Sequence, residues 1–255
     1  MWKFDYSGDP FNENTKIDLR YLNEKIAGES GFIGLSEDKE SFVLGNGKPV
    51  RFWACNTTVY RRDDGCLKTH ARFLAKIGVN MVRMHGSATP KNKGEPLASG
   101  DPKNTDNAWR MVAAMKEQGI YSTISPYWPH NGHCGGLDPQ ENWGIEDYAG
   151  SDGMWGLLFF NEKLQEAYKS WTYDMYAKVN PYTGIALCDD PSVGIIQIQN
   201  EDSLLFWTVS SIKGAQRRIL EAKFTSWLEN KYGSLTAAVK NWDGETAEGD
   251  DAHGL

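Results

Sequence analysis

The sequence lacks the segments that would carry a protein into a membrane or onto a polyanion. None of its 255 residues lies in an apolar stretch long enough to span a bilayer. The net charge is -7 at pH 7, and no stretch is rich in lysine and arginine. We therefore expect neither membrane nor nucleic acid as a partner, and a neutral or cationic ligand fits better.

Cysteine is scarce, and the four cysteines show no paired short spacing. The four cysteines are Cys55, Cys66, Cys134 and Cys188. This spacing argues against a disulfide framework and a four-thiolate zinc site, so we expect reduced thiols. The N-terminus also lacks the basic start and apolar run of a secretory signal. A signal removed earlier would leave no trace, so the localisation stays open between the cytoplasm and a secreted or periplasmic site.

Aromatic residues, in contrast, are abundant, with 10 Trp and 11 Tyr. Flat aromatic faces pack against the apolar C–H faces of sugar rings, and most such side chains otherwise belong to cores. Trp128, Trp143, Trp155 and Trp207 lie in predicted loops and could face a substrate. Trp109, Trp171 and Trp227 lie in helical patterns, where packing between helices and sheet is expected.

An apolar β-rich run, a loop and a helical pattern recur four times along the chain. This recurrence is typical of a parallel α/β architecture. The predicted strands are 50–56, 79–84, 119–125 and 193–199. The predicted helices are 67–77, 106–119, 161–179 and 213–232, the second starting near Asp106 as its N-cap.

The predicted organisation is an N-terminal extension, residues 1–46, followed by the four units in residues 47–255. Phe42–Leu44 and the turn Gly45–Gly47 predict a small hairpin that covers one end of the main domain. Because a TIM (β/α)8 barrel needs eight strands, four leave two unpaired edges. We expect a partial barrel completed by the remainder of a longer polypeptide, by a second chain or by two associating halves. An open sheet covered by helices is the structural alternative.

The dipeptide Asn200-Glu201 directly follows the fourth predicted strand. Barrel enzymes carry their active sites at the carboxyl ends of the strands. Glycoside cleavage with retention needs one carboxyl to protonate the leaving oxygen and a second, about 5 to 5.5 Å away, to attack the anomeric carbon. An amide side chain beside the acid can form a hydrogen bond with the sugar 2-hydroxyl. An isolated Asn-Glu is otherwise more often a helix start or an exposed pair.

A strand that ends in Asn-Glu resembles the fourth strand of glycoside hydrolase clan A, which includes families 5 and 42. Residues 47–56 resemble the first strand of the clan, and residues 78–85 resemble its second. Residues 224–242 are similar to a segment of family 42-like β-galactosidases. The runs Asn180–Gly184, Asp190-Pro191 and Asn200–Asp202 look most like large bacterial members. Asp202 stands where family 5 often has proline, which leaves the subfamily open.

The resemblance implies a retaining glycosidase for β-linked oligo- or polysaccharides, without cofactor or metal. It implies that Glu201 is the acid/base, that Asn200 contacts the 2-hydroxyl and that Arg83 supports the carboxylates. It also implies that His85 lines the sugar site, although Arg83 and His85 could serve structure alone. The nucleophile would be a glutamate after a seventh strand, outside this chain, so these residues alone would be inactive.

Three further residues are predicted to line the cleft: Trp128, His130 and Trp207. Two other functions stay open. A non-catalytic carbohydrate-binding or assembly module would keep the aromatic contacts without hydrolysis. A zinc-dependent hydrolase would use His130, His133 and Cys134, but such a site needs a further ligand or water and supporting partners, so a loop lining the cleft is favoured.

Overall fold

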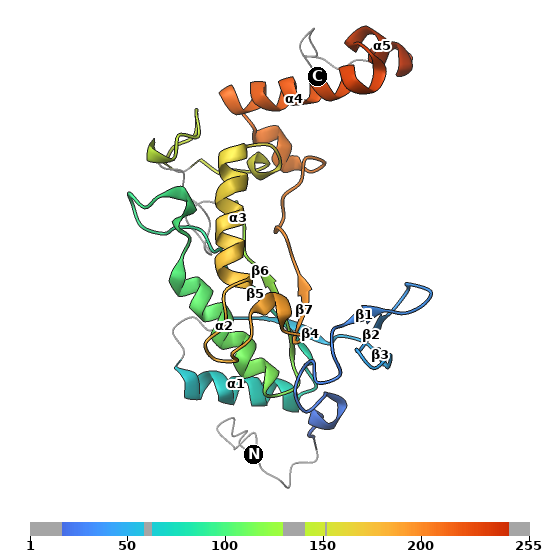
Figure 1. Ribbon diagram of the computed structural model, residues 1–255, viewed down its shortest axis with the longest axis vertical. Helices are drawn as coiled ribbons and strands as arrows, with labels where there is room; N and C mark the ends of the chain where they lie inside the picture. The colour runs from blue at the N-terminus through green and yellow to red at the C-terminus, as the bar shows by residue number, and fades with distance from the viewer. Residues whose placement is uncertain (1–16, 59–62, 130–140, 151, 245–255) are drawn as a thin grey trace, which may run out of the picture.

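A parallel four-stranded sheet forms the centre of the protein (Figure 1). The computed structural model describes residues 17–58, 63–129, 141–150 and 152–244. The strands are β4 (Ala54–Thr57), β5 (Met81–His85), β6 (Tyr121–Ser125) and β7 (Val193–Ile196), and they lie side by side in chain order. The helices that connect them are α1 (Asp64–Lys76), α2 (Pro102–Lys116) and α3 (Glu162–Tyr176). Strand–helix–strand units in this order confirm the predicted α/β architecture.

A small antiparallel sheet covers the amino end of the parallel sheet. Its strands are β1 (Gly34–Leu35), β2 (Phe42–Val43) and β3 (Pro49–Val50). Buried Ala27, Leu44, Met81 and Tyr121 form the contact between the two sheets. The predicted hairpin is confirmed, but β3 lies beyond the predicted boundary at residue 46. The predicted first strand, 50–56, is therefore wrong in extent, because Val50 pairs with Phe42 and the parallel strand begins at Ala54.

Side chains alternate between the two faces of β5. Val82 and Met84 are buried in the main core with the helices, whereas Arg83 and His85 are only partly buried. Alternate residues of a strand point to opposite faces, so Arg83 and His85 share the face turned away from that core. Arg83 is in register with Asn56 on β4 and Thr123 on β6. In a closed barrel, this face would line the interior.

The main core lies between the sheet and helices α1 to α3. Its fully buried members include Leu67, Met111, Ile124 and Trp171. Burial of each such side chain contributes about 1.5–3 kcal/mol to folding. Trp109 packs against this core and donates from Nε1 to the carbonyl of Met175 at 2.9 Å. The packing roles predicted for Trp109 and Trp171 are confirmed.

The three helices that connect the strands begin at side chains that accept hydrogen bonds from free backbone amides. Asp63 caps α1 and Asn161 caps α3. The start predicted for α2 near Asp106 is wrong, because Asp101 accepts from two backbone amides and Pro102 occupies the first turn. Proline fits there, since the amide it lacks would have no partner in the helix. Short 3-10 helices are η1 (Arg20–Leu22), η2 (Leu97–Ser99), η3 (Glu141–Trp143), η4 (Leu157–Phe159), η5 (Leu187–Asp189) and η6 (Trp207–Ser211).

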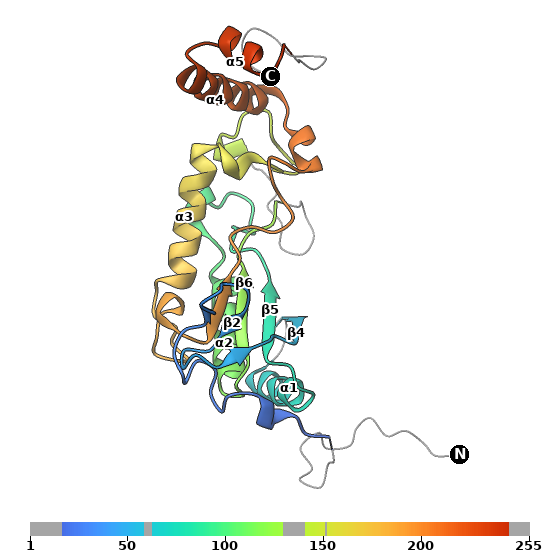
Figure 2. The ribbon, with the colours of Figure 1, turned by 90° about the vertical axis from the view of Figure 1, so that its right-hand side faces the viewer.

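The last two helices, α4 (Gly214–Tyr232) and α5 (Leu235–Asn241), lie away from the strands. Both views place them beyond the far end of α3 (Figures 1 and 2). Trp227 on α4 is 50% exposed and stacks on Phe224 at 5.8 Å between ring centroids. The prediction that Trp227 packs against the sheet is wrong, because α4 leaves the sheet instead of covering it.

The four described parallel strands do not close into a barrel, so β4 and β7 form two edges. Apolar side chains are exposed at and just beyond β7, where Ile196 is 51% and Ile198 is 69% exposed. Trp53, just before β4, is 70% exposed. Such edges favour pairing with further strands. No helix within the described ranges is long and apolar enough to cross a membrane.

Candidate active site

A polar cluster lies at the carboxyl ends of β5 and β7, centred on Arg83. Its guanidinium donates from Nε to Oε1 of Gln197 at 2.8 Å and from Nη2 to Oδ1 of Asn200 at 2.6 Å. Gln197 in turn donates to the carbonyl oxygen of Gln199 at 3.1 Å. Because β6 lies between β5 and β7, the Arg83 side chain reaches across β6 to contact Gln197 and Asn200. Arg83 therefore fixes the segment that leaves β7.

Glu201 follows Asn200 on a backbone that L-amino acids seldom adopt. Its φ is 48°, in the left-handed region, which costs a side-chain-bearing residue about 1–2 kcal/mol. The backbone amide of Asn200 donates to the backbone carbonyl of Tyr127 at 3.1 Å. This bond ties the segment after β7 to the segment after β6. Asn200 is buried and Glu201 is exposed. Strain of this kind persists only where surrounding contacts hold it, and it concentrates at functional sites.

His85 joins the cluster from β5, two residues beyond Arg83. Its Nε2 lies 3.5 Å from Nδ2 of Asn200, and its ring centroid lies 4.9 Å from that of Trp128. Burial lowers the pKa of His85, the charge of Arg83 adds to this, and Glu201 opposes it. The imidazole is therefore neutral at pH 7. Since Nε2 faces an amide donor, we assign the ring proton to Nδ1.

A second group of contacts surrounds Asp202. Its carboxylate accepts the backbone amide of Gly156 with both oxygens, at 3.0 and 2.9 Å, and also accepts the side-chain amide of Gln199. Burial raises the pKa of Asp202, while hydrogen bonds from Gly156 and Thr208 oppose the rise. Asp202 thus links the loop after β6 to the segment after β7.

Two tryptophans from these segments meet beside that link. Trp155 precedes Gly156, and its ring centroid lies 5.2 Å from that of Trp207 at an interplanar angle of 52°. Phe206 lies 5.7 Å from Trp207 on the same segment. Trp207 is 57% exposed and so offers a face for a ligand. The described contacts place Trp207 with Trp155 rather than with Arg83.

The remaining predicted residues divide between the interior and the undescribed loop. Trp143 is buried and donates from Nε1 to the carbonyl of Glu95 at 2.8 Å, so it packs instead of facing a substrate. His130, His133 and Cys134 lie outside the described residues, and the zinc alternative stays a prediction. Within the described part of the chain, no three His, Cys, Asp or Glu side chains gather as a metal site would require.

The sequence analysis gave no role to Gln197, and it did not predict that Asp202 contacts Gly156 or that Trp155 packs against Trp207. A local signal existed for Gln197, because a glutamine interrupts the apolar run Val193–Ile198. The hydrogen bond between Asp202 and Gly156 joins residues 46 positions apart, and no local sequence pattern predicts it.

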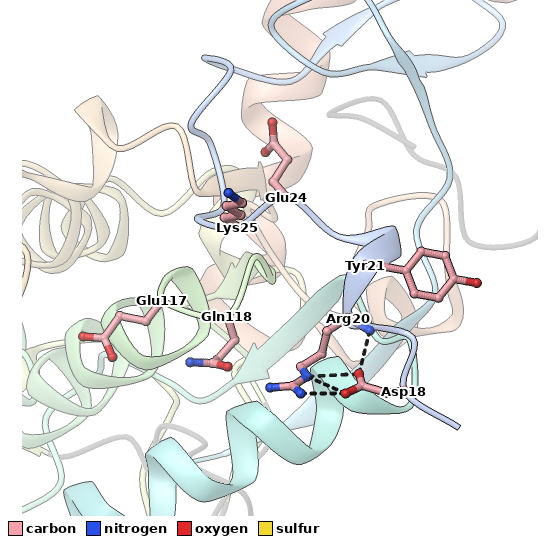
Figure 3. Close-up of a pocket in the computed structure, with 7 residues that line it drawn as sticks. All are labelled: Asp18, Arg20, Tyr21, Glu24, Lys25, Glu117 and Gln118. Carbon is pink, nitrogen blue, oxygen red and sulfur yellow. Dashed lines mark hydrogen bonds and ion pairs between the residues drawn. The ribbon is translucent and has the colours of Figure 1, made fainter. Parts of the chain in front are cut away.

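A hollow of about 510 Å³ lies at the opposite end of the strands (Figure 3). It is lined by Asp18, Arg20, Tyr21, Glu24, Lys25, Glu117 and Gln118. Asp18 and Arg20 pair at 2.6 Å, and the hydrogen bonds from Arg20 lower the pKa of Asp18 to about 2. Glu24 accepts the hydroxyl of Tyr121. Asp18, Arg20 and Glu24 thus bond within the protein, as expected for the stabilising end of a barrel, and we assign no function to this hollow.

Solved structures with a similar fold are glycoside hydrolases. An endo-1,4-beta-mannanase from Rhizomucor miehei is 15% identical over 87% of this chain, with a TM-score of 0.54. A glycoside hydrolase family 5 mannosidase from the same organism is 14% identical over 82% of this chain, with a TM-score of 0.50. The protein shares the fold of part of these glycoside hydrolase structures.

The chain spans 64% of the mannanase structure and 53% of the mannosidase structure. At these identities the likeness shows the fold, and it confirms the predicted partial (β/α)8 barrel. No family model matches the sequence, and no curated protein matches it. The likeness supports a glycosidase-like fold.

Proposed function

We propose that the four β/α units, predicted to lie in residues 47–255, form the acid/base half of a retaining glycoside hydrolase that acts on β-linked oligo- or polysaccharides. The observation that carries the proposal is the position of Glu201. It stands on a left-handed turn at the carboxyl end of the fourth parallel strand, next to an asparagine held by Arg83. Barrel enzymes place catalytic groups at this end of their strands.

The proposed reaction has two steps. Glu201 donates its proton to the glycosidic oxygen while a second carboxylate attacks the anomeric carbon, so the leaving group departs and a glycosyl-enzyme forms. Glu201 then removes a proton from water, which attacks the same carbon and releases the sugar with its configuration retained.

Asn200 would orient the sugar through its amide. Because Oδ1 accepts from Arg83, the Nδ2 group is left as the donor, and it faces His85 at 3.5 Å. A sugar 2-hydroxyl could accept from this group, an interaction that strengthens in the transition state. Trp128, packed on His85, would form part of the wall around the same sugar.

The second carboxylate would come from strands that this chain does not supply. The edges at β4 and β7 are open, with Ile196 and Ile198 exposed at one of them. We propose that four further β/α units of the same polypeptide pair with both edges. Closure would bury these side chains and bring a carboxylate to about 5 to 5.5 Å from Glu201.

The first test measures the intact mass of the natural gene product and assays it beside the 255-residue chain. Both are given 4-nitrophenyl β-glycosides of several sugars, mannosides included because the structural neighbours are named for mannan and mannoside hydrolysis. We expect release of 4-nitrophenol by a longer product alone. Activity of the 255 residues by themselves would contradict the need for a second half.

The second test places Glu201→Gln in the active product. Loss of a general acid typically costs about 10² to 10⁴ in rate. The matched control is Glu166→Gln, an exposed glutamate of α3 that pairs only with Lys169 among the described contacts. Unchanged turnover with Glu201→Gln would overturn the acid/base assignment. Saccharide binding without hydrolysis by every product would favour the non-catalytic module.

A further inference from the structure

A side-chain bridge spans the turn that carries Glu201. Gln199 lies on one side of the Asn200-Glu201 pair and Asp202 on the other, and the amide of Gln199 donates to Oδ2 of Asp202. The bridge therefore closes over the residue whose φ is 48°. Because a left-handed turn needs contacts to hold it, the bridge accounts for part of that support.

The bridge is anchored to the loop after β6 at a position that favours glycine. Gly156 has a φ of 75° and donates its amide to both oxygens of Asp202. A Cβ atom at Gly156 would lie 2.8 Å from Cδ1 of Ile212. The backbone angle therefore strains any residue with a Cβ, and the Ile212 side chain would have to shift to admit one, so glycine suits this position.

The same carboxylate reaches the segment that carries Trp207. The hydroxyl of Thr208 contacts Asp202, and Thr208 is fully buried. Trp155 directly precedes Gly156 and Trp207 directly precedes Thr208, so each of these two contacts of Asp202 is the chain neighbour of one tryptophan of the pair. One side chain therefore joins the Glu201 turn to both tryptophans.

We propose that Asp202 is a positioning residue that holds the Glu201 turn and the Trp155–Trp207 pair in one fixed arrangement. Its effect on catalysis rests on the proposed role of Glu201. Its effect on the tryptophan pair is independent of the role of Glu201, so the two effects can be tested separately.

The first test uses circular dichroism of the 255-residue chain. Two tryptophan rings with centroids 5.2 Å apart give an exciton couplet in the far ultraviolet, and Trp207→Phe identifies it by removing it. Asp202→Ala should lose this couplet while the helical signal stays. The matched control is Asp174→Asn on the surface of α3, where Asp174 pairs with Lys178 at 2.7 Å. The control should keep the couplet.

Asp202→Asn serves where the alanine variant fails to fold. It keeps the size of the side chain and one oxygen for the Gly156 amide, but it loses the second acceptor. A weaker couplet is expected. A full couplet in either folded variant would overturn the proposed link between Asp202 and the tryptophans.

The second test measures kcat/KM of the active, longer product for aryl glycosides of one sugar with good and poor leaving groups. A dinitrophenyl group departs without protonation, whereas a poor leaving group needs the general acid. Asp202→Ala should lose about tenfold more rate on the poor leaving group than on the good one, because Glu201 is misplaced. A purely structural defect would lower both rates equally and would overturn the positioning role.

Glu201→Gln separates this failure from failure of the proposed function. If Glu201→Gln shows the leaving-group dependence and Asp202→Ala does not, the positioning role is wrong and the acid/base assignment stands. If Glu201→Gln shows none, the acid/base assignment is wrong, and the couplet alone decides whether Asp202 organises the tryptophan pair.

Discussion

Arg83 determines how Asn200 presents its amide at the carboxyl end of β7. A guanidinium donates in two fixed directions, here to Gln197 and Asn200, and an ammonium group cannot match both. We predict that Arg83→Lys lowers the free energy of unfolding by about 1–3 kcal/mol, measured by urea titration. Arg217→Lys is the control, since Arg217 pairs with Glu221 on the exposed surface of α4. Equal effects of the two substitutions would contradict a structural role for the Arg83 bonds.

His85 gives the protein a dependence on pH with a defined sign. Burial lowers the pKa of His85 in the folded state, whereas unfolding restores it towards 6.5. As the pH falls below that value, the unfolded state takes up the proton first, so folding loses stability. We predict that His85→Gln flattens the decline in urea midpoint between neutral and mildly acidic pH. If the urea midpoint of His85→Gln declines with falling pH as steeply as that of the unsubstituted chain, other groups cause the decline.

At the scale of single elements, α2 depends on its first turn. Asp101 accepts from the amides of Lys103 and Asn104 at 2.9 and 3.3 Å. We predict that Asp101→Ala lowers the free energy of unfolding by about 1 kcal/mol, and that Asp101→Ser, which can still cap, retains most of it. Thermal unfolding of both variants measures the difference. A serine variant as unstable as the alanine variant would mean that the cap contributes little.

The sequence predicted elements well where the signal was local. Gly78 has a φ of 86° just after α1, as a glycine at a helix end should. β7 begins at Val193 as predicted, but it ends at Ile196 instead of residue 199, so Asn200 begins the Asn-Glu pair four residues after the strand. Val50 was misplaced because an apolar β-rich run does not reveal that Val50 pairs with Phe42 in another sheet.

Contacts between distant segments could not be predicted from one sequence. Arg83 meets Asn200 across 117 positions, and Asp202 meets Gly156 across 46. Trp227 was assigned to the core because its helical pattern looks like that of Trp171. Only the path of α4, which leaves the sheet, makes Trp227 exposed while Trp171 is buried.

At the scale of the whole molecule, the exposed edge at β7 should matter only when the barrel is closed. We predict that Ile196→Lys leaves the stability of the 255-residue chain within about 0.5 kcal/mol, because Ile196 is 51% exposed there. In the longer product, it should cost about 2 kcal/mol or more, since a charge would be buried without a partner. Tyr173→Lys, on α3 with Tyr173 63% exposed, is the control and should be mild in both.

The measurement is the denaturant midpoint of the 255-residue chain and of the longer product, each carrying Ile196→Lys or Tyr173→Lys. If Ile196→Lys is as mild in the longer product as in the 255-residue chain, further strands do not cover β7. Barrel closure at this edge would then be wrong, even if the longer product hydrolyses glycosides.

Glu201 is the proposed acid/base of a retaining glycosidase. Azide rescue of Glu201→Ala in the longer product, with a dinitrophenyl β-glycoside as substrate, tests this role. Without Glu201, water attacks the glycosyl-enzyme slowly, and azide needs no general base. We predict faster turnover with azide and a β-configured glycosyl azide as product. An α-configured azide would make Glu201 the nucleophile, and no effect of the substitution would remove Glu201 from the reaction.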